Sequence, residues 1–96
     1  MTTVTPPKER LDRGDGTGLG DPWRVIVLND DHNTFEGVAF ALARTIPGVD
    51  YDRGIALANK IHNEGQAIVW SGPKEQAELY WEQLRDQGLT MAPLER

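Results

Sequence analysis

Apolar residues in this chain gather in short continuous runs and in longer periodic stretches, with Gly, Pro, Asn and Asp between them. Residues 23–28 and 66–70 are rich in β-branched and aromatic residues, a composition that is typical of strands. The first run is apolar almost throughout, so we expect a central strand that is covered on part of both faces. Residues 89–94 predict a short last strand, which Pro93 confines to an edge or interrupts, because proline has no N–H for the ladder.

The first helix is expected directly after the first strand. Asn33 followed by Glu36 matches a capping box, and Pro47-Gly48 ends the helix, since proline disfavours helical backbone in the residue before it. Between these ends, apolar residues repeat at the spacing of one buried helix face. The positions expected to be buried are Phe35, Val38, Ala39, Leu42, Ala43 and Ile46.

Two further helices are expected, one on each side of the 66–70 strand. Asp50 suits the N-cap of the second helix, and Gly65 suits the residue that follows its last turn. Pro73 suits the first position of the third helix, where its missing N–H does no harm, and Gly88 ends that helix. Along the second helix, one stripe holds, on or near it, Tyr51, Ile55, Ala58, Ile61 and His62, and the third helix is expected to bury Ala77, Tyr80, Trp81 and Leu84.

The element order is therefore strand, helix, helix, strand, helix, strand. It predicts an α+β domain of two layers over residues 22–96, in which a three-stranded antiparallel sheet carries three helices on one face. Residues 1–21 contain Pro6, Pro7 and four glycines but few aliphatic residues. Such a segment cannot bury enough apolar surface to offset its ordering entropy, so we expect a disordered N-terminal tail.

Composition and charge narrow the classes of function. The chain has 96 residues, which suit one small domain, and a formal net charge of -5, which argues against nucleic acid as the main partner. It contains no cysteine, so disulfides, thiolate metal sites and a cysteine nucleophile are excluded. No apolar run resembles a signal peptide or approaches the roughly 18 residues of a membrane span. We therefore expect a cytoplasmic protein, and a monomer.

The candidate chemistry lies in the polar stretch 29–35 and at His62, near the end of the second helix. By itself, a stretch rich in Asn and Asp is typical of a connection between a strand and a helix. If the first two helices pack together on the sheet, however, Asn29 and Asp30 face His62 across a small gap, and the three side chains form a rim of acceptors. The apolar wall beneath this rim would consist of Phe35, Val38, Ala58 and Ile61. An apolar hole rimmed by acceptors suits an ammonium group attached to a hydrophobic side chain, such as a free protein N-terminus.

Two motifs together resemble a known family. Asn29-Asp30-Asp31 after a strand, and the His-x-x-Gly-x-Ala pattern of residues 62–67 after a helix, are similar to those of the ClpS family of N-degron adaptors. The resemblance covers about residues 23–96. It implies a non-enzymatic protein without a cofactor or metal, which binds the free α-amino group and large hydrophobic first side chain of a substrate. It also implies delivery of that substrate to the N-terminal domain of a Clp-type AAA+ unfoldase, for degradation by the Clp peptidase.

The resemblance also implies roles for individual residues. The α-amino contacts would be Asn29, Asp30 and His62. The substrate backbone and the pocket would be contacted by Asp31, Asn33, Phe35, Val38, Ala58, Ile61 and Met91. The positions used for docking to the unfoldase would be His32, Glu75 and Tyr80.

This chain departs from the family pattern at several of these positions. Family members commonly carry Thr-Pro-Met where this chain has Asn33-Thr34-Phe35, and often carry methionine in place of Ala58. One position gains bulk and the other loses it, so we expect a reshaped pocket whose preference for the first residue is altered. Tyr80 replaces a basic docking residue, and the correspondence slips by one residue near Met91.

Three other kinds of function fit parts of the sequence. A divalent metal would suit Asp30, Asp31, His32, His62 and Glu64, although neighbouring residues of an extended segment point to opposite faces. A hydrolase would use His62 as its base, but no nucleophile stands in a recognisable elbow and no oxyanion donor is evident. A protein-interaction module without recognition of a terminal amine is the strongest alternative, because the pocket residues differ from the usual ones.

Overall fold

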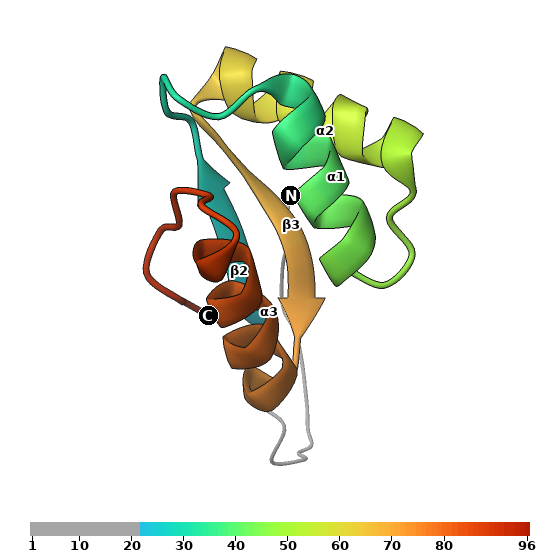
Figure 1. Cartoon of the computed structure of the whole chain (residues 1–96). Coiled ribbons are helices and arrows are strands. Elements are labelled where there is room, and N and C mark those ends of the chain that lie inside the picture. The colour runs from blue at the N-terminus through green and yellow to red at the C-terminus, as the bar shows by residue number, and fades with distance from the viewer. Residues whose placement is uncertain (1–21) are drawn as a thin grey trace.

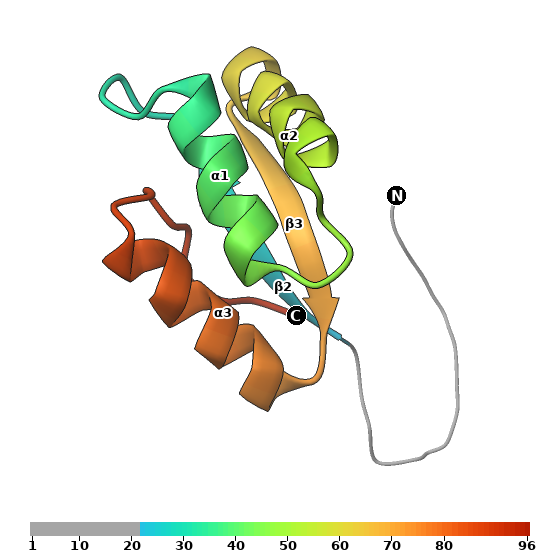
Figure 2. The same ribbon diagram turned by 45° about the vertical axis from the view of Figure 1, so that its right-hand side comes forward.

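A computed structural model describes residues 22–96, and the expected disordered tail lies outside these residues. The elements in order are β2 (Trp23–Leu28), α1 (Phe35–Thr45), α2 (Tyr51–Glu64), β3 (Gln66–Gly72) and α3 (Lys74–Asp86). The two strands pair in antiparallel fashion. Figures 1 and 2 show the three helices on one side of the sheet, with α1 in the middle. The predicted α+β class, helices and antiparallel sheet are therefore confirmed.

The predicted third strand does not form a regular strand, since the described residues give a two-stranded sheet. The segment after α3 instead runs along the outer edge of β2 through two isolated bridges. Two backbone hydrogen bonds join this segment to β2: the Leu28 N–H donates to the Thr90 carbonyl at 2.8 Å, and the Ala92 N–H donates to the Ile26 carbonyl at 3.1 Å. The register then shifts by one residue across Pro93, since one bridge joins Val27 to Met91 and the other joins Arg24 to Glu95.

The first strand, β2, has the central position that its continuous apolar run predicted. It lies between β3 and the C-terminal segment. Val25 and Val27 belong to the core cluster, and Ile26 between them is also buried. Because successive residues of a strand point to opposite faces, this burial covers β2 from both sides.

The start of α1 differs from the prediction. Thr34, and not Asn33, is the N-cap, because the Thr34 hydroxyl accepts a hydrogen bond from the Gly37 N–H at 2.9 Å. The side chain of Asn33 is used elsewhere, in contacts described below. The ends of α2 are as predicted: Asp50 caps the first turn, and Gly65 follows the last turn in the left-handed conformation.

The face of α2 that is buried also differs in part from the predicted stripe. Leu57, Ala58 and Ile61 are buried, whereas Tyr51 and His62 are exposed. Gly54 lies against α1, where a Cβ atom on Gly54 would come within 2.7 Å of the Ala39 carbonyl oxygen. The backbones of the two helices therefore approach closely at this glycine.

We expect Gly54→Ala to lower the free energy of unfolding by about 1–3 kcal/mol, because the added methyl group would overlap the backbone of α1. In a helix interior alanine is normally more stabilising than glycine, so a destabilising effect here would come from the close approach of α1 and α2. Denaturant unfolding measures it, with Ala56→Ser on the exposed face of α2 as the control, which should change stability by less than about 0.5 kcal/mol. An equally stable or more stable Gly54→Ala variant would contradict the packing.

Candidate functional site

The end of β2 meets the end of α2 through one backbone contact. The Asn29 N–H donates to the Gly65 carbonyl at 2.9 Å, and the Gly65 N–H in turn donates to the Ile61 carbonyl at 2.9 Å. Gly65 has a φ of 90°, a left-handed conformation that L side chains rarely adopt. The turn at Gly65 thus brings Asn29 to the side of the helix end that carries His62.

A small cleft lies where these two ends and the start of α1 come together. It has roughly 360 Å³ of free space, part of which is open solvent. Its lining residues are Val27, Leu28, Asn29, Asp30, Asn33, Phe35, Val38, Ala58, Ile61, His62 and Leu89. The lining residues Val38, Ala58 and Ile61 are buried, whereas Asn29 and His62 are exposed. The cleft therefore has an apolar wall and a polar mouth.

Most of the residues that were expected to contact the substrate line this cleft, but two of them do not. The Asp31 side chain is fully exposed. Met91 is half-buried against the core and is not among the lining residues. Leu89, which was not expected in the site, belongs to the wall and is buried. Sequence gave little signal for Leu89, because it lies in the irregular segment after α3 and not on a periodic helix face.

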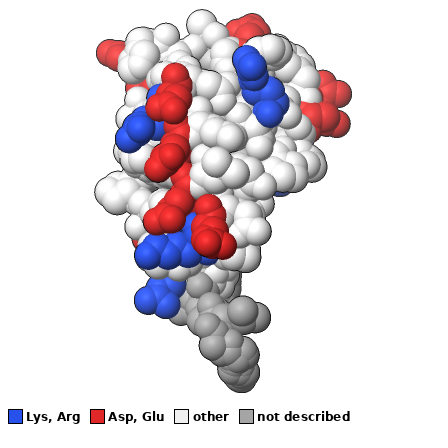
Figure 3. Space-filling model, turned by 60° about the horizontal axis from the view of Figure 1, so that its bottom comes forward, with Lys and Arg blue, Asp and Glu red and all other residues white. Residues whose placement is uncertain are grey.

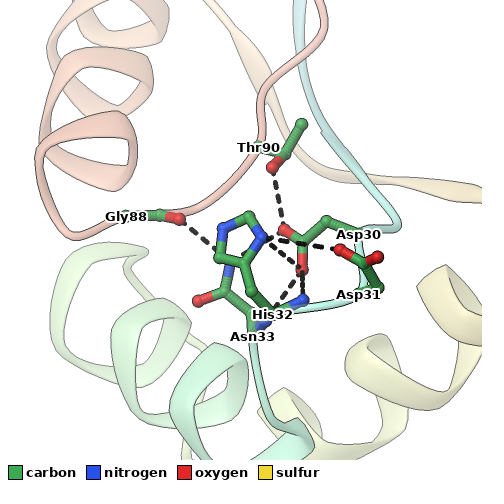
Figure 4. A network of polar contacts seen from close by, with 6 residues as sticks. All are labelled: Asp30, Asp31, His32, Asn33, Gly88 and Thr90. Atoms are coloured by element: carbon green, nitrogen blue, oxygen red, sulfur yellow. Dashed lines mark hydrogen bonds and ion pairs between the residues drawn. The ribbon is translucent and has the colours of Figure 1, made fainter.

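The carboxylate of Asp30 is surrounded by donors from its own turn and from the C-terminal segment (Figure 4). Its Oδ1 accepts from the His32 N–H at 3.1 Å and the Asn33 N–H at 2.8 Å. Its Oδ2 accepts from the Asn33 side-chain amide at 2.7 Å and the Thr90 hydroxyl at 2.8 Å. A carboxylate has about four positions for accepted hydrogen bonds, so this set occupies all of them. The Asn33 amide also donates to the Gly88 carbonyl at 2.9 Å.

These contacts fix the charge of Asp30. Burial raises the pKa of the carboxyl, but the hydrogen bonds from Asn33, Thr90 and His32 outweigh it and place the pKa far below its usual value. The carboxylate therefore stays anionic, with its side chain only 11% exposed. Its oxygens accept hydrogen bonds from the protein, and a direct bond from Asp30 to a ligand stays a prediction.

His62 and Asn29 have the opposite character. Within residues 22–96, no hydrogen bond forms to the imidazole of His62 or to the side-chain amide of Asn29. The His62 ring packs edge-on against Phe35, with the ring centroids 5.2 Å apart and an angle of 64° between the planes. Phe35 thus lies at the mouth beside the imidazole. Both polar side chains can offer acceptors to a ligand in the cleft.

The residues expected to bind an unfoldase do not form one compact group. His32 is exposed beside Asp30 and Asp31, and the bond from Asn33 to Gly88 places this turn at the C-terminal end of α3. Glu75 is exposed in the first turn of α3, at the other end of that helix. Tyr80 is half-buried, and its ring packs edge-on against Trp70 at 5.0 Å.

The surface around α3 is acidic. Its exposed carboxylates recur at helical spacing, at Glu75, Glu78, Glu82 and Asp86. Figure 3 shows a row of acidic side chains down one face of the molecule, with basic side chains at its lower end. Such a face favours a partner with a basic patch.

The structure gives no support to the metal alternative. No group of three His, Cys, Asp or Glu side chains within the described residues is placed to hold a metal ion. The Nδ1 atom of His32 lies 3.7 Å from Asp30 Oδ1 and 3.9 Å from Asp31 Oδ1, and Asp31 points to solvent. The part of the chain that the structure describes also contains no helix that could cross a membrane.

Comparisons with known proteins identify a class of adaptors for an ATP-dependent protease. The family described as "ATP-dependent Clp protease adaptor protein ClpS" matches residues 20–95. The chain belongs to the ClpS family.

Individual relatives show how close the match is. The "ATP-dependent Clp protease adapter protein ClpS" of Thermosynechococcus vestitus is 63% identical over 73 residues, which cover 76% of this chain and 78% of the relative. The ClpS adapter of Synechocystis is 60% identical over 74 residues, covering 77% of this chain and 76% of the relative. The chloroplastic adapter CLPS1 of Arabidopsis thaliana is 34% identical over 87 residues, which cover 90% of this chain and 55% of that protein.

A solved structure matches the fold as well. The structure of Agrobacterium tumefaciens ClpS2 bound to L-phenylalaninamide superposes with a TM-score of 0.72 at 25% identity. The match covers 78% of this chain and 95% of that chain.

We expect Asp30→Ala to lower the free energy of unfolding by about 1.5–3 kcal/mol at neutral pH, because hydrogen bonds to a partly buried charge are lost. The pKa of Asp30 is lower in the folded state than its unfolded value of about 3.9. Its stabilising contribution is therefore present above that unfolded pKa and is lost as the pH falls toward the folded pKa.

Denaturant unfolding of the wild type and the variant from pH 7 down to pH 2.5 would follow this loss. The difference in stability should shrink below about pH 4. Asp31→Ala is the matched control, because the side chain of Asp31 is fully exposed, and it should stay within about 0.5 kcal/mol of the wild type throughout. A difference for Asp30→Ala that is the same at every pH would contradict the assignment.

Proposed function

We propose that this ClpS-family protein is a monomeric N-degron adaptor whose domain, residues 22–96, captures a substrate by its N-terminus. The cleft receives the free α-amino group at its mouth and the hydrophobic first side chain against its wall. The observation that carries the proposal is the pairing of Asn29 and His62, whose side chains form no hydrogen bond with another described residue, with the buried apolar wall beneath them. The domain then delivers its substrate to the N-terminal domain of a Clp-type AAA+ unfoldase.

The chemistry of the mouth suits an ammonium group. An ammonium has three N–H donors and no acceptor, so it needs oxygen or nitrogen lone pairs around it. The side-chain amide oxygen of Asn29 and an imidazole nitrogen of His62 supply two of these lone pairs. Asp30 contributes a fixed negative charge close by, which favours a cation over a neutral group. L-phenylalaninamide, the ligand of the Agrobacterium protein, joins an amine to an aromatic side chain and so matches both parts of the cleft.

The wall of the cleft sets which first side chain fits. Phe35 occupies the mouth beside His62, while Ala58 forms part of the buried wall. A small residue at position 58 leaves room that a longer side chain would fill. The proposed ligand is therefore a large apolar residue such as Phe or Leu, whose end lies toward Ala58.

Docking to the unfoldase is proposed on the exposed side of α3 and its neighbouring turn. Glu75 and His32 are both accessible there. The ring of Tyr80 is partly covered by Trp70, so less of its surface is available for contact with the unfoldase than that of a fully exposed side chain. The acidic residues of α3 give this surface a charge that suits a basic patch on the partner.

Amine capture is tested by comparing two peptides that differ only at the N-terminus. We expect a peptide that begins with free Phe to bind at least about tenfold more tightly than its N-acetylated twin, because acetylation removes the charge and two donors. His62→Ala should lower the affinity for the peptide with a free N-terminus by about tenfold. Fluorescence anisotropy or calorimetry measures both.

The exposed histidine outside the cleft provides the control. His32→Ala should leave the affinity for the free peptide unchanged, because His32 does not line the cleft. Equal binding of the free and acetylated peptides would remove the amine site and would favour a protein-interaction module of another kind.

A change at position 58 tests the wall. Ala58→Met should fill space in the cleft and weaken binding of a peptide that begins with Phe by about threefold to tenfold more than that of one that begins with Leu, because the larger first residue is overpacked more strongly. A panel of peptides that vary only in the first residue measures the preference. An unchanged order of preference would show that the first side chain does not reach Ala58.

A further inference from the structure

We infer that Thr90 and Asn33 are positioning residues for the amine site, and that they act through the carboxylate of Asp30. The inference rests on the proposed function, adds Thr90 to the site and gives Asn33 a role that needs no contact with the ligand. It follows from the way one short segment after α3 contacts both sides of Asn29.

Thr90 contacts the chain on both sides of Asn29. Its carbonyl accepts from the Leu28 N–H at 2.8 Å, one residue before Asn29. Its hydroxyl donates to Asp30 Oδ2 at 2.8 Å, one residue after Asn29. Asn29 is therefore the residue between two contacts to a single threonine, and its own N–H is bonded to Gly65 at 2.9 Å. These three bonds fix its backbone.

Asn33 closes the same turn from the other side, as Figure 4 shows. Its backbone N–H and its side-chain amide donate to the two oxygens of Asp30, at 2.8 Å and 2.7 Å. The same amide donates to the Gly88 carbonyl at 2.9 Å. The turn is thus fastened to residues 88–90 at two points, through Gly88 and through Thr90.

The segment 88–90 also shapes the apolar part of the cleft. Between the Gly88 carbonyl and the Thr90 hydroxyl lies Leu89, which is buried and lines the cleft. One three-residue segment therefore holds the polar mouth in place and supplies part of the wall. Asp30, with every acceptor position filled, contributes its charge and the shape of the turn, while the side chains of Asn29 and His62, unbonded among residues 22–96, accept from the amine.

Removing the Thr90 hydroxyl tests this arrangement with little change of shape. Thr90→Val should weaken binding of a peptide with a free N-terminal Phe by about threefold to tenfold, because the turn that carries Asn29 loses a charge-assisted hydrogen bond. Thr90→Ser, which keeps the hydroxyl, should restore the affinity to within about twofold of the wild type. Thermal unfolding and an NMR amide spectrum of each variant establish that the fold is retained.

A second threonine provides the matched control. The Thr45 hydroxyl accepts a hydrogen bond from the Gln87 side chain at 2.7 Å and lies outside the cleft. Thr45→Val should leave peptide affinity unchanged even if it lowers stability as much as Thr90→Val does. Equal losses of affinity in the two valine variants would overturn the inference, because a general loss of stability would then explain both.

A double-mutant cycle tests whether Thr90 acts through Asp30. In an Asp30→Ala background, Thr90→Val should cause no further loss of affinity, since the group it orients is gone. Losses that multiply independently would overturn the inference, as would a wild-type affinity in Thr90→Val. Failure of this inference can be told from failure of the proposed function by measuring the wild type. Equal binding of the free and acetylated peptides by the wild type would mean that amine capture itself fails.

Discussion

The hydrogen bond from the Asn29 N–H to the Gly65 carbonyl is the contact on which the candidate site depends. It joins the end of β2 to the end of α2 at 2.9 Å, and the cleft lies where these ends meet. The contact requires the chain to reverse directly after α2, which the left-handed backbone of Gly65 allows. The close approach of α1 and α2 at Gly54 supports the same arrangement, because it places the α1 and α2 residues of the wall together.

The polar groups around this contact divide into two kinds. The side chains of Asp30 and Asn33 are occupied by bonds inside the protein, whereas those of Asn29 and His62 bond to no other residue of the range 22–96. The bonds of Asp30 and Asn33 fix the shape of the cleft mouth. The acceptors of Asn29 and His62 then favour a ligand that donates hydrogen bonds to them. The proposed selectivity for a free amine follows from that division. The partly buried carboxylate of Asp30 adds a charge that does not depend on a bond to the ligand.

Local patterns in the sequence were enough to predict most of the fold. The β-branched run of 23–28, the helical spacing of Val38 with Leu42, and the ends of α2 at Asp50 and Gly65 all appear in the structure as predicted. Each of these signals acts over a few neighbouring residues. The third strand was predicted by the same reasoning, but the segment after α3 forms only two isolated bridges to β2, whose registers differ by one residue across Pro93.

The polar details of the site were predicted less completely, because they depend on contacts between distant parts of the chain. Asn33 was expected to cap α1, but Gly88 and Asp30 use its side chain, and Thr34 becomes the cap. Thr90 and Leu89 were missed because they follow α3 without any periodic pattern. The placement of Asn29, Asp30 and His62 around one cleft was anticipated, and their roles toward a ligand stay predictions.

The most direct measurement is an NMR titration of the backbone amides with L-phenylalaninamide. We expect the largest shifts on the residues that meet at the cleft, namely Asn29, Val38, Ile61 and His62, and little change in the amides of α3 near Glu75. Shifts concentrated on α3, or shifts that N-acetyl-L-phenylalaninamide reproduces in full, would contradict the claim that these two chain ends form a receptor for a free amine.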